Sequence, residues 1–208
     1  MKLFLDSADA DAIVSRYNTG LIAGVTTNPT LIKKSGKDPQ DVYNELMKVG
    51  IPDISMEITA DSAEEFFANA MGHVKTYGEH TTIKLPCSVD GLRACKRLSD
   101  VSIRVNVTLI FSPVQAILAS LAGATYISPF IGRMDDNSLD GMKLINDIKN
   151  VGVSSQILAA SIRDPQSVGT AFALGADICT VPINVFDKMY NHVLTDKGLE
   201  QFNKDAAI

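Results

Sequence analysis

Residues 104–121 of the chain read RVNVTLIFSPVQAILASL, and they contain one complete strand–helix unit. Arg104–Leu109 is short, apolar and rich in β-branched residues, which is typical of a buried strand. Ser112 and Pro113 then provide a helix N-cap and a proline at the first helical position. Four apolar residues follow at the i, i+3, i+4, i+7 spacing of an amphipathic helix: Val114, Ile117, Leu118 and Leu121.

The same unit repeats along the whole chain. Short apolar runs recur every twenty to thirty residues, which is the length of one strand with its helix. The eight strand candidates are Leu3–Asp6, Gly24–Asn28, Ile54–Thr59, Thr82–Pro86, Arg104–Leu109, Tyr126–Phe130, Gln156–Ala160 and Ile178–Pro182.

Helical signals fill the segments between these runs. Asp38-Pro39 and Asp164-Pro165 repeat the cap-and-proline start, and Gly123 and Gly175 stand where two helices are expected to end. The apolar helical spacing recurs at Phe67, Ala70, Met71 and Val74.

Strands that alternate with helices form a parallel sheet. Eight repeats with no second domain favour an α/β fold of one domain over residues 1–208, a (β/α)8 TIM barrel with eight parallel strands. The length of 208 residues is close to the lower limit for such a barrel, roughly 200 residues. An open doubly wound sheet is the alternative, but its first turn should be rich in glycine, and Ser7-Ala8-Asp9-Ala10 is not.

The composition excludes several classes of protein. Hydrophobic residues make up 46% of the chain, enough to bury a large core without disulfides or metals. A net charge of −5 argues against a nucleic-acid partner, although a few arginines can still attract an anion into one cleft. The three cysteines show no CxxC spacing, and the sequence shows no secretory leader. It also has no apolar run of the ~18 residues that span a bilayer. These features predict a cytoplasmic protein without a membrane partner.

Polar residues end otherwise apolar strands, and in a (β/α)8 barrel these ends surround the active site. Residues two apart on a strand share a face, so Thr26 with Asn28, and Asn106 with Thr108, should point the same way. The full set at or just after strand ends is Asp6, Thr26, Asn28, Glu57, Lys84, Asn106, Thr108, Ser128, Ser161 and Arg163.

Lys84 is the strongest signal in this set, because lysine is rarely buried without a partner. Desolvation would lower its pKa from the reference of about 10.4, and a neutral amine can attack a ketone to form an iminium that acts as an electron sink. This chemistry needs no cofactor and no metal. The alternatives are a lysine that reaches past the strand to water, or one held by a carboxylate.

Two carboxylates are candidate proton shuttles for this amine. Asp6 ends the first strand and Glu57 lies late in the third, next to the strand that carries Lys84. The alternatives are that Asp6 caps the following helix, and that Glu57 merely holds Lys84 as an ion pair.

Phosphate binding is predicted at Arg133, Ser161 and Arg163, which follow the sixth and seventh strands. Arg163 also precedes the helix start at Asp164, where backbone N–H groups favour an anion. The alternative for Arg133 is a surface salt bridge to Asp135 or Asp136.

Five blocks of these strand ends resemble the short-type transaldolases, a family of class I Schiff-base aldolases that also contains the fructose-6-phosphate aldolases. The likeness runs in order from Leu3 to about Phe202. The blocks are Gly24–Thr30, Ile83–Pro86, Asn106–Ser112, Ser128–Arg133 and Ala159–Arg163.

The resemblance implies a role for each residue of the set. Lys84 would be the Schiff-base lysine, Asp6 the base and acid at the C4 hydroxyl, and Glu57 with Thr108 would hold the water that shuttles protons. The implied substrate-binding residues are Thr26, Asn28, Asn106, Ser128 and Phe130, and the implied phosphate-binding residues are Arg133, Ser161 and Arg163. The resemblance implies no cofactor and no metal.

Two positions separate the activities of the family. The aldolase branch carries glutamine where Glu57 stands and tyrosine where Phe130 stands, so this chain is expected to be a transaldolase. It would convert sedoheptulose 7-phosphate and glyceraldehyde 3-phosphate into erythrose 4-phosphate and fructose 6-phosphate in the pentose phosphate pathway. The alternatives are a fructose-6-phosphate aldolase that releases dihydroxyacetone, a barrel lyase or isomerase with an electrostatic lysine, and an inactive scaffold.

The C-terminus departs from the family pattern. The sequence stops at Ile208, six residues after Phe202, whereas family members usually continue into a longer final helix. In decameric relatives that helix packs on a neighbouring subunit. We expect a short C-terminal helix over about 195–208 that contacts a neighbouring subunit, and the resemblance implies a homo-oligomer, a decamer of two pentamers.

Overall fold

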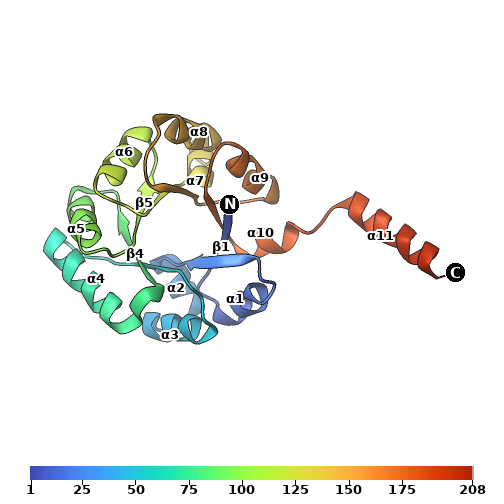
Figure 1. Cartoon of the computed structure of the whole chain (residues 1–208), viewed down its shortest axis with the longest axis horizontal. Coiled ribbons are helices and arrows are strands. Elements are labelled where there is room, and N and C mark those ends of the chain that lie inside the picture. The colour runs from blue at the N-terminus through green and yellow to red at the C-terminus, as the bar shows by residue number, and fades with distance from the viewer. Residues whose placement is uncertain (208) are drawn as a thin grey trace.

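Eight parallel strands close into a barrel in the computed structural model, which describes residues 1–207 (Figure 1). The strands follow one another in chain order, and the last one pairs with the first. They are β1 (Lys2–Asp6), β2 (Ile22–Thr26), β3 (Ile54–Glu57), β4 (Thr81–Pro86), β5 (Val105–Ile110), β6 (Tyr126–Pro129), β7 (Gln156–Ala159) and β8 (Ile178–Val181). The predicted (β/α)8 barrel is confirmed, and the open sheet is excluded.

Several strands end earlier than predicted. Strand β2 stops at Thr26 rather than at Asn28, because Asn28 is the N-cap of the next helix and its Oδ1 accepts a hydrogen bond from the Leu31 N–H at 3.0 Å. Strand β3 stops at Glu57 rather than at Thr59.

Helices surround the barrel as an outer ring (Figure 1). The helices of the chain up to residue 188 are α1 (Ala10–Tyr17), α2 (Pro29–Ser35), α3 (Pro39–Val49), α4 (Ala63–Tyr77), α5 (Val89–Asp100), α6 (Pro113–Leu121), α7 (Ile131–Asp135), α8 (Gly141–Val151), α9 (Pro165–Ala173) and α10 (Ile183–Lys188), with a 3-10 turn, η1, at Gly78–His80. A last helix, α11 (Val193–Ala206), is not part of this ring. Side chains of Asp38, Ser112 and Asp164 cap their helices as predicted. Gly123 and Gly175 follow two helix ends with φ of 84° and 104°, a conformation that glycine adopts without strain.

The buried faces of two helices differ from the predicted ones. In α6 the side chains of Val114, Leu118 and Leu121 are exposed, while Ala116 and Ala119 face the barrel. In α4 the side chains of Phe66 and Ala70 are buried, whereas Met71 is exposed. The helical period was correct, but small residues rather than the apolar stripe of α6 contact the sheet.

Side chains alternate between two environments along each strand. Val25, Ile83 and Val107 point outward into the core between the barrel and the helices. A smaller cluster of Phe4, Tyr126, Leu158, Ala160 and Ile178 fills the barrel interior. Above this cluster, at the carboxyl ends of the strands, the inward residues become polar.

Asp53 closes the opposite end of the barrel. Its buried carboxylate accepts hydrogen bonds from the Thr82 hydroxyl at 2.8 Å and the Tyr126 hydroxyl at 2.7 Å, and it pairs with Arg104 at 3.0 Å. This network leaves the carboxyl ends of the strands as the open mouth.

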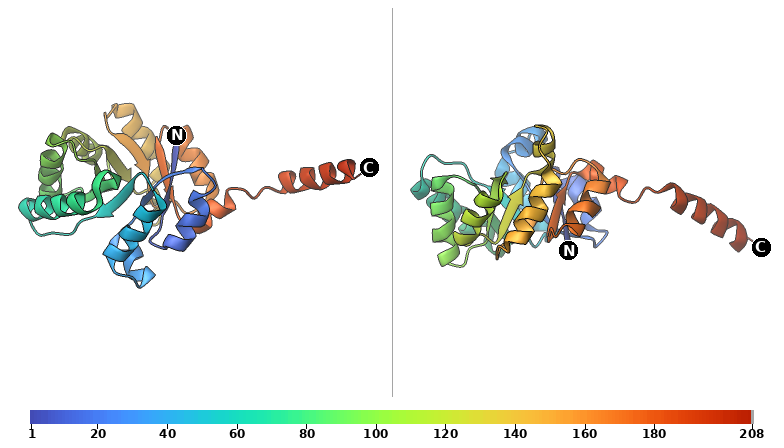
Figure 2. Two further views of the ribbon diagram at one scale, coloured as in Figure 1. Left: turned by 60° about the horizontal axis from the view of Figure 1, so that its bottom comes forward. Right: turned by 90° about the horizontal axis from the view of Figure 1, so that it is seen from above.

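Helix α11 lies apart from the barrel and projects away from it (Figure 2). None of its described residues is buried, and Val193, Leu194, Leu199 and Phe202 are more than half exposed. The predicted C-terminal range ends at Ile208, which lies outside the described residues. No helix within residues 1–207 combines the length and the apolar character that crossing a membrane requires.

Candidate functional site

A cavity of about 130 Å³ opens at the carboxyl ends of the strands. Nine of its twelve lining residues are predicted site residues: Asp6, Thr26, Asn28, Lys84, Asn106, Ser128, Phe130, Arg133 and Ser161. The other three are Leu158, Ala160 and Thr180. The predicted residues Glu57, Thr108 and Arg163 lie outside this lining.

Lys84 is held inside the barrel by two oxygen atoms. It is 4% exposed, its Nζ lies 3.0 Å from Glu57 Oε2, and it donates a hydrogen bond to the Thr27 carbonyl at 2.9 Å. Pairing in register across β3 and β4 places Glu57 directly beside Lys84. The lysine does not reach bulk water, and Glu57 is close enough to exchange a proton with it.

Asp6 faces the same cavity from β1. Its Oδ1 accepts a hydrogen bond from the Thr26 hydroxyl at 2.7 Å. It does not cap helix α1, because the neighbouring Asp9 does so by accepting from the Ala12 N–H. Although Asp6 keeps some surface open to the cavity, burial of its carboxyl group raises its pKa, and the Lys84 charge and the Thr26 hydrogen bond oppose this rise.

A chain of hydrogen bonds fixes the amide of Asn106. The Ser128 hydroxyl donates to Asn106 Oδ1 at 2.7 Å, and Asn106 Nδ2 donates to the Ser55 hydroxyl at 3.2 Å. All three residues are buried. The predicted residues Asn106 and Ser128 are therefore in direct contact, and the Asn106 amide is also held by Ser55, which is not among the predicted site residues.

Thr108 is buried and unpartnered. Its Oγ1 has no hydrogen-bond partner within residues 1–207. The chain bulges just after it, since Leu109 adopts φ 60° and the register against β6 shifts between Val107 and Ile110. A buried hydroxyl without a protein partner fits a residue that binds a water molecule or a ligand atom.

The two predicted phosphate arginines are in different situations. The Arg133 guanidinium lies over the Phe130 ring, 4.9 Å from its centroid, and lines the cavity. Arg163 instead forms an ion pair with Asp136, with 2.5 Å between Nη2 and Oδ2. Arg133 pairs with neither Asp135 nor Asp136, so the surface salt bridge proposed as its alternative role is wrong.

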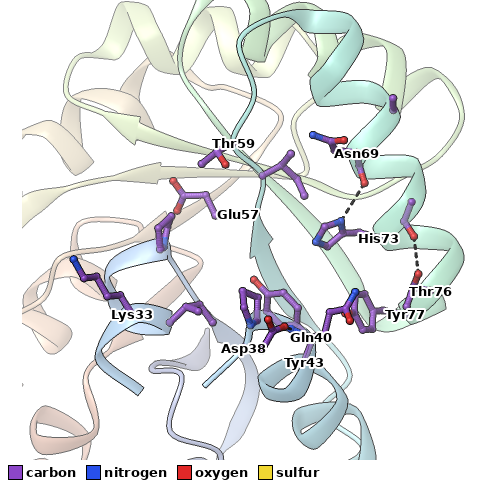
Figure 3. A pocket seen from close by; sticks show the side chains of 16 residues that line it. Lys33, Asp38, Gln40, Tyr43, Glu57, Thr59, Asn69, His73, Thr76 and Tyr77 are labelled. Atoms are coloured by element: carbon purple, nitrogen blue, oxygen red, sulfur yellow. Dashed lines mark hydrogen bonds between the residues drawn. The ribbon is translucent and has the colours of Figure 1, made fainter. Parts of the chain in front are cut away.

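A second hollow of about 970 Å³ lies between α2, α3 and α4 and reaches Glu57 from the side (Figure 3). Tyr43, His73 and Tyr77 form an aromatic cluster along it. Glu57 therefore faces this groove, while Lys84 faces the barrel mouth.

Metal-ligating residues are not concentrated anywhere in the described chain: no three histidine, cysteine or carboxylate side chains among residues 1–207 lie close enough to hold an ion.

The whole chain is similar to one protein family. A family model described as transaldolase/fructose-6-phosphate aldolase matches residues 3–207. A protein called probable transaldolase from Caulobacter vibrioides is 49% identical over 211 residues, covering 100% of this chain and 97% of the relative. Proteins of the same description from Ruegeria pomeroyi and Lactiplantibacillus plantarum are 49% and 45% identical, each covering 99% of this chain and 96% of the relative.

A solved structure supports the architecture alone. A soluble mutant of the membrane-associated (S)-mandelate dehydrogenase from Pseudomonas putida superposes with a TM-score of 0.63 over 91% of this chain and 68% of that chain. Its sequence identity is 14%, so the likeness concerns the fold.

Proposed function

Because this chain belongs to the transaldolase/fructose-6-phosphate aldolase family, we propose that it is a transaldolase whose Schiff base forms on Lys84. It transfers a dihydroxyacetone unit from sedoheptulose 7-phosphate to glyceraldehyde 3-phosphate, and erythrose 4-phosphate and fructose 6-phosphate result. The observation that carries this proposal is an amine that is 4% exposed, paired with Glu57 at 3.0 Å and directed into a polar cavity.

In the first step Lys84 attacks the C2 ketone of the donor. Glu57 takes a proton from the Lys84 ammonium group and returns it to the C2 oxygen, and a second N–H proton follows, so this oxygen leaves as water and an iminium remains. The unpartnered Thr108 hydroxyl and the Glu57 carboxylate are suited to hold this water. The same water returns when the imine is hydrolysed.

In the second step the C3–C4 bond breaks. Asp6 takes the proton of the C4 hydroxyl, the aldose phosphate leaves as an aldehyde, and the electron pair of the broken bond enters the iminium to give an enamine on Lys84. Reversal of these steps with the acceptor aldehyde forms the new bond. Asn28, Asn106 and Ser128 line the cavity where substrate hydroxyl groups would bind.

We assign binding of the substrate phosphate group to Arg133, Ser161 and Arg163. The stacking of Arg133 on Phe130 supports a guanidinium held at the cavity. Binding of the remote phosphate orients the reacting carbons, which is a large contribution to catalysis.

The alternative activity is that of a fructose-6-phosphate aldolase, which protonates the enamine and releases dihydroxyacetone. Phe130 favours the transferase, since a phenyl ring cannot donate that proton. A phenol at this position can supply it.

The assembly and its setting are part of the proposal. The exposed apolar side chains of α11 support contact with a neighbouring subunit in a homo-oligomer, for which the family suggests a decamer of two pentamers. We place the enzyme in the cytoplasm and in the pentose phosphate pathway, with sugar phosphates as its small-molecule partners.

A product assay tests the proposed activity. With both substrates, wild-type protein should form erythrose 4-phosphate and fructose 6-phosphate, and Lys84→Met should form neither. Without an acceptor, wild type should release little dihydroxyacetone, while Phe130→Tyr should release more. Release of dihydroxyacetone by wild type at the rate of transfer would identify an aldolase, and no turnover at all would favour an electrostatic lyase or isomerase or an inactive scaffold.

A further inference from the structure

Thr180 is linked to the carboxylate of Asp6 through the hydroxyl group of Thr26. It is on β8, 3% exposed, and lines the barrel-mouth cavity. Its Oγ1 lies 2.6 Å from Thr26 Oγ1, and the Thr26 hydroxyl in turn donates to Asp6 Oδ1 at 2.7 Å. Three strands, β8, β2 and β1, are therefore joined through one line of hydrogen bonds.

The number of available protons determines which group donates in each of these hydrogen bonds. A hydroxyl group has one proton to donate, and an ionised carboxylate only accepts. Thr26 uses its proton on Asp6, so the short contact between the two threonines must be a hydrogen bond that Thr180 donates. The order is Thr180 to Thr26 to Asp6.

We propose that Thr180 is a positioning residue for the base of this site: its hydroxyl orients Thr26, and Thr26 fixes the Asp6 carboxylate toward the cavity. This inference rests on the proposed function, in which Asp6 removes the C4 hydroxyl proton. Thr180 acts through Thr26, so it is required for the orientation and basicity of Asp6 rather than for contact with the reacting atoms.

The charged groups around Asp6 explain why one neutral hydroxyl matters. Lys84 on β4 favours the ionised carboxylate, Glu57 on β3 opposes it, and Arg133 lines the same cavity. Burial raises the pKa of Asp6, and only the Lys84 charge and the Thr26 hydrogen bond are seen to lower it. Hydrogen bonds to a charged acceptor are about twice as strong as neutral ones. Because the bond from Thr180 strengthens the bond from Thr26 to Asp6, loss of Thr180 should destabilise ionised Asp6 more than protonated Asp6.

A purely structural role for Thr180 makes a different prediction. Valine has nearly the same shape as threonine and lacks the hydroxyl, whereas serine keeps the hydroxyl and lacks the methyl group. If only packing mattered, Thr180→Val would be silent and Thr180→Ser would be the damaging change. If the hydroxyl matters, the order is reversed.

The first test compares the pH dependence of turnover. In Thr180→Val the acidic limb should move to higher pH by roughly a tenth to half of a unit, since the bond from Thr180 strengthens the Thr26–Asp6 bond only cooperatively. The turnover number should fall about threefold to tenfold with KM within about twofold, and Thr180→Ser should resemble wild type. The final extent of borohydride trapping on Lys84 should be unchanged in both variants, since imine formation does not use Asp6.

The second test does not depend on turnover. NMR titration of protein labelled with ¹³C at the aspartate carboxyl carbon reports Asp6, with Asp6→Asn as the assignment control. Thr180→Val should titrate at higher pH than wild type and Thr180→Ser should not. Identical titration of Thr180→Val and wild type, or a shift in both variants, would overturn the inference, whereas failure of wild type to convert sugar phosphates would overturn the proposed function only.

Discussion

Asp6 illustrates how one side chain can oppose folding while serving the chemistry. Burial raises its pKa above the reference value of 3.8, so the folded protein binds this proton more tightly than the unfolded chain does. The contribution of Asp6 to the free energy of unfolding is therefore fully present at low pH, and it is lost as the pH rises through the raised pKa. The same raised pKa improves the carboxylate as a base for a sugar hydroxyl.

We expect Asp6→Asn to lose activity and gain stability. Asparagine cannot accept the C4 proton, so the turnover number should fall by about 10²-fold to 10⁴-fold. It also cannot ionise, so at neutral pH its free energy of unfolding should exceed that of wild type. The difference should shrink as the pH falls through the raised pKa of Asp6, and denaturant unfolding across pH measures it.

Asp9→Ala is the matched control for this comparison. Asp9 is three residues away and caps α1, so its loss should destabilise the protein by about 1 kcal/mol while activity remains. An Asp6→Asn protein that is less stable than wild type at neutral pH would contradict the assignment of Asp6 as a buried, costly carboxylate.

Residue types and spacing predicted most of the cavity lining but missed two of the residues that hold it in place. Ser55 shares an inward face with Glu57, and Thr180 shares one with Ile178, so the alternation of side chains along a strand could have identified both. The pairing of Arg163 with Asp136 was not predictable, because the two residues are separated by 27 positions and meet only through the packing of loops.

At the scale of elements, periodicity predicts that a helix has an apolar stripe but not which face contacts the sheet. In α6 the alanines at 116 and 119 allow a close approach to the barrel, which leaves Val114, Leu118 and Leu121 outside. Strand ends were also misplaced where the next helix begins at once, as at Asn28. Tertiary packing decides both features, and it is not encoded in a local pattern.

The α7 segment provides a test of the phosphate site. Asp136 follows α7 and holds Arg163 in an ion pair in which both side chains are about half exposed. In Asp136→Asn the Arg163 guanidinium loses its ion-pair partner, and a negative charge is removed from the proposed phosphate site. KM for the phosphorylated substrates should therefore fall. The effect should not exceed about fivefold, since exposed pairs contribute up to about 1 kcal/mol.

Asp135→Asn serves as the control for this change. Asp135 lies next to Asp136, but its carboxylate accepts from the Gly141 N–H and not from an arginine. Steady-state kinetics and competition by inorganic phosphate measure both variants. Equal KM values in Asp136→Asn and wild type, or the same decrease in both variants, would remove Arg163 from the phosphate site.

At the scale of the whole molecule, the barrel was predictable because eight similar units repeat and each can bury its apolar face only against its neighbours. Helix α11 is different. Its described residues bury nothing against the rest of the chain, so the sequence of this chain specifies a helix without specifying where it lies. Apolar side chains on such a helix are stabilised when a second molecule covers them.

We expect the apolar face of α11 to hold the assembly together. Leu199→Ser combined with Phe202→Ser should convert an oligomer into smaller species, because both side chains are more than half exposed in the single chain and would be covered only in the assembly. Sedimentation velocity measures this change, with Gln201→Ser on the same helix as the control. A wild-type protein that sediments as a monomer, or a double variant that keeps the size of wild type, would contradict the proposed contact.

The proposed chemistry as a whole depends on covalent attachment of substrate to one amine. Wild-type protein incubated with fructose 6-phosphate and sodium borohydride should gain a reduced three-carbon adduct, and peptide mass spectrometry should locate it on Lys84. Lys84→Met should gain none. A Lys84 peptide that stays unmodified in wild type under these conditions would contradict the Schiff-base mechanism.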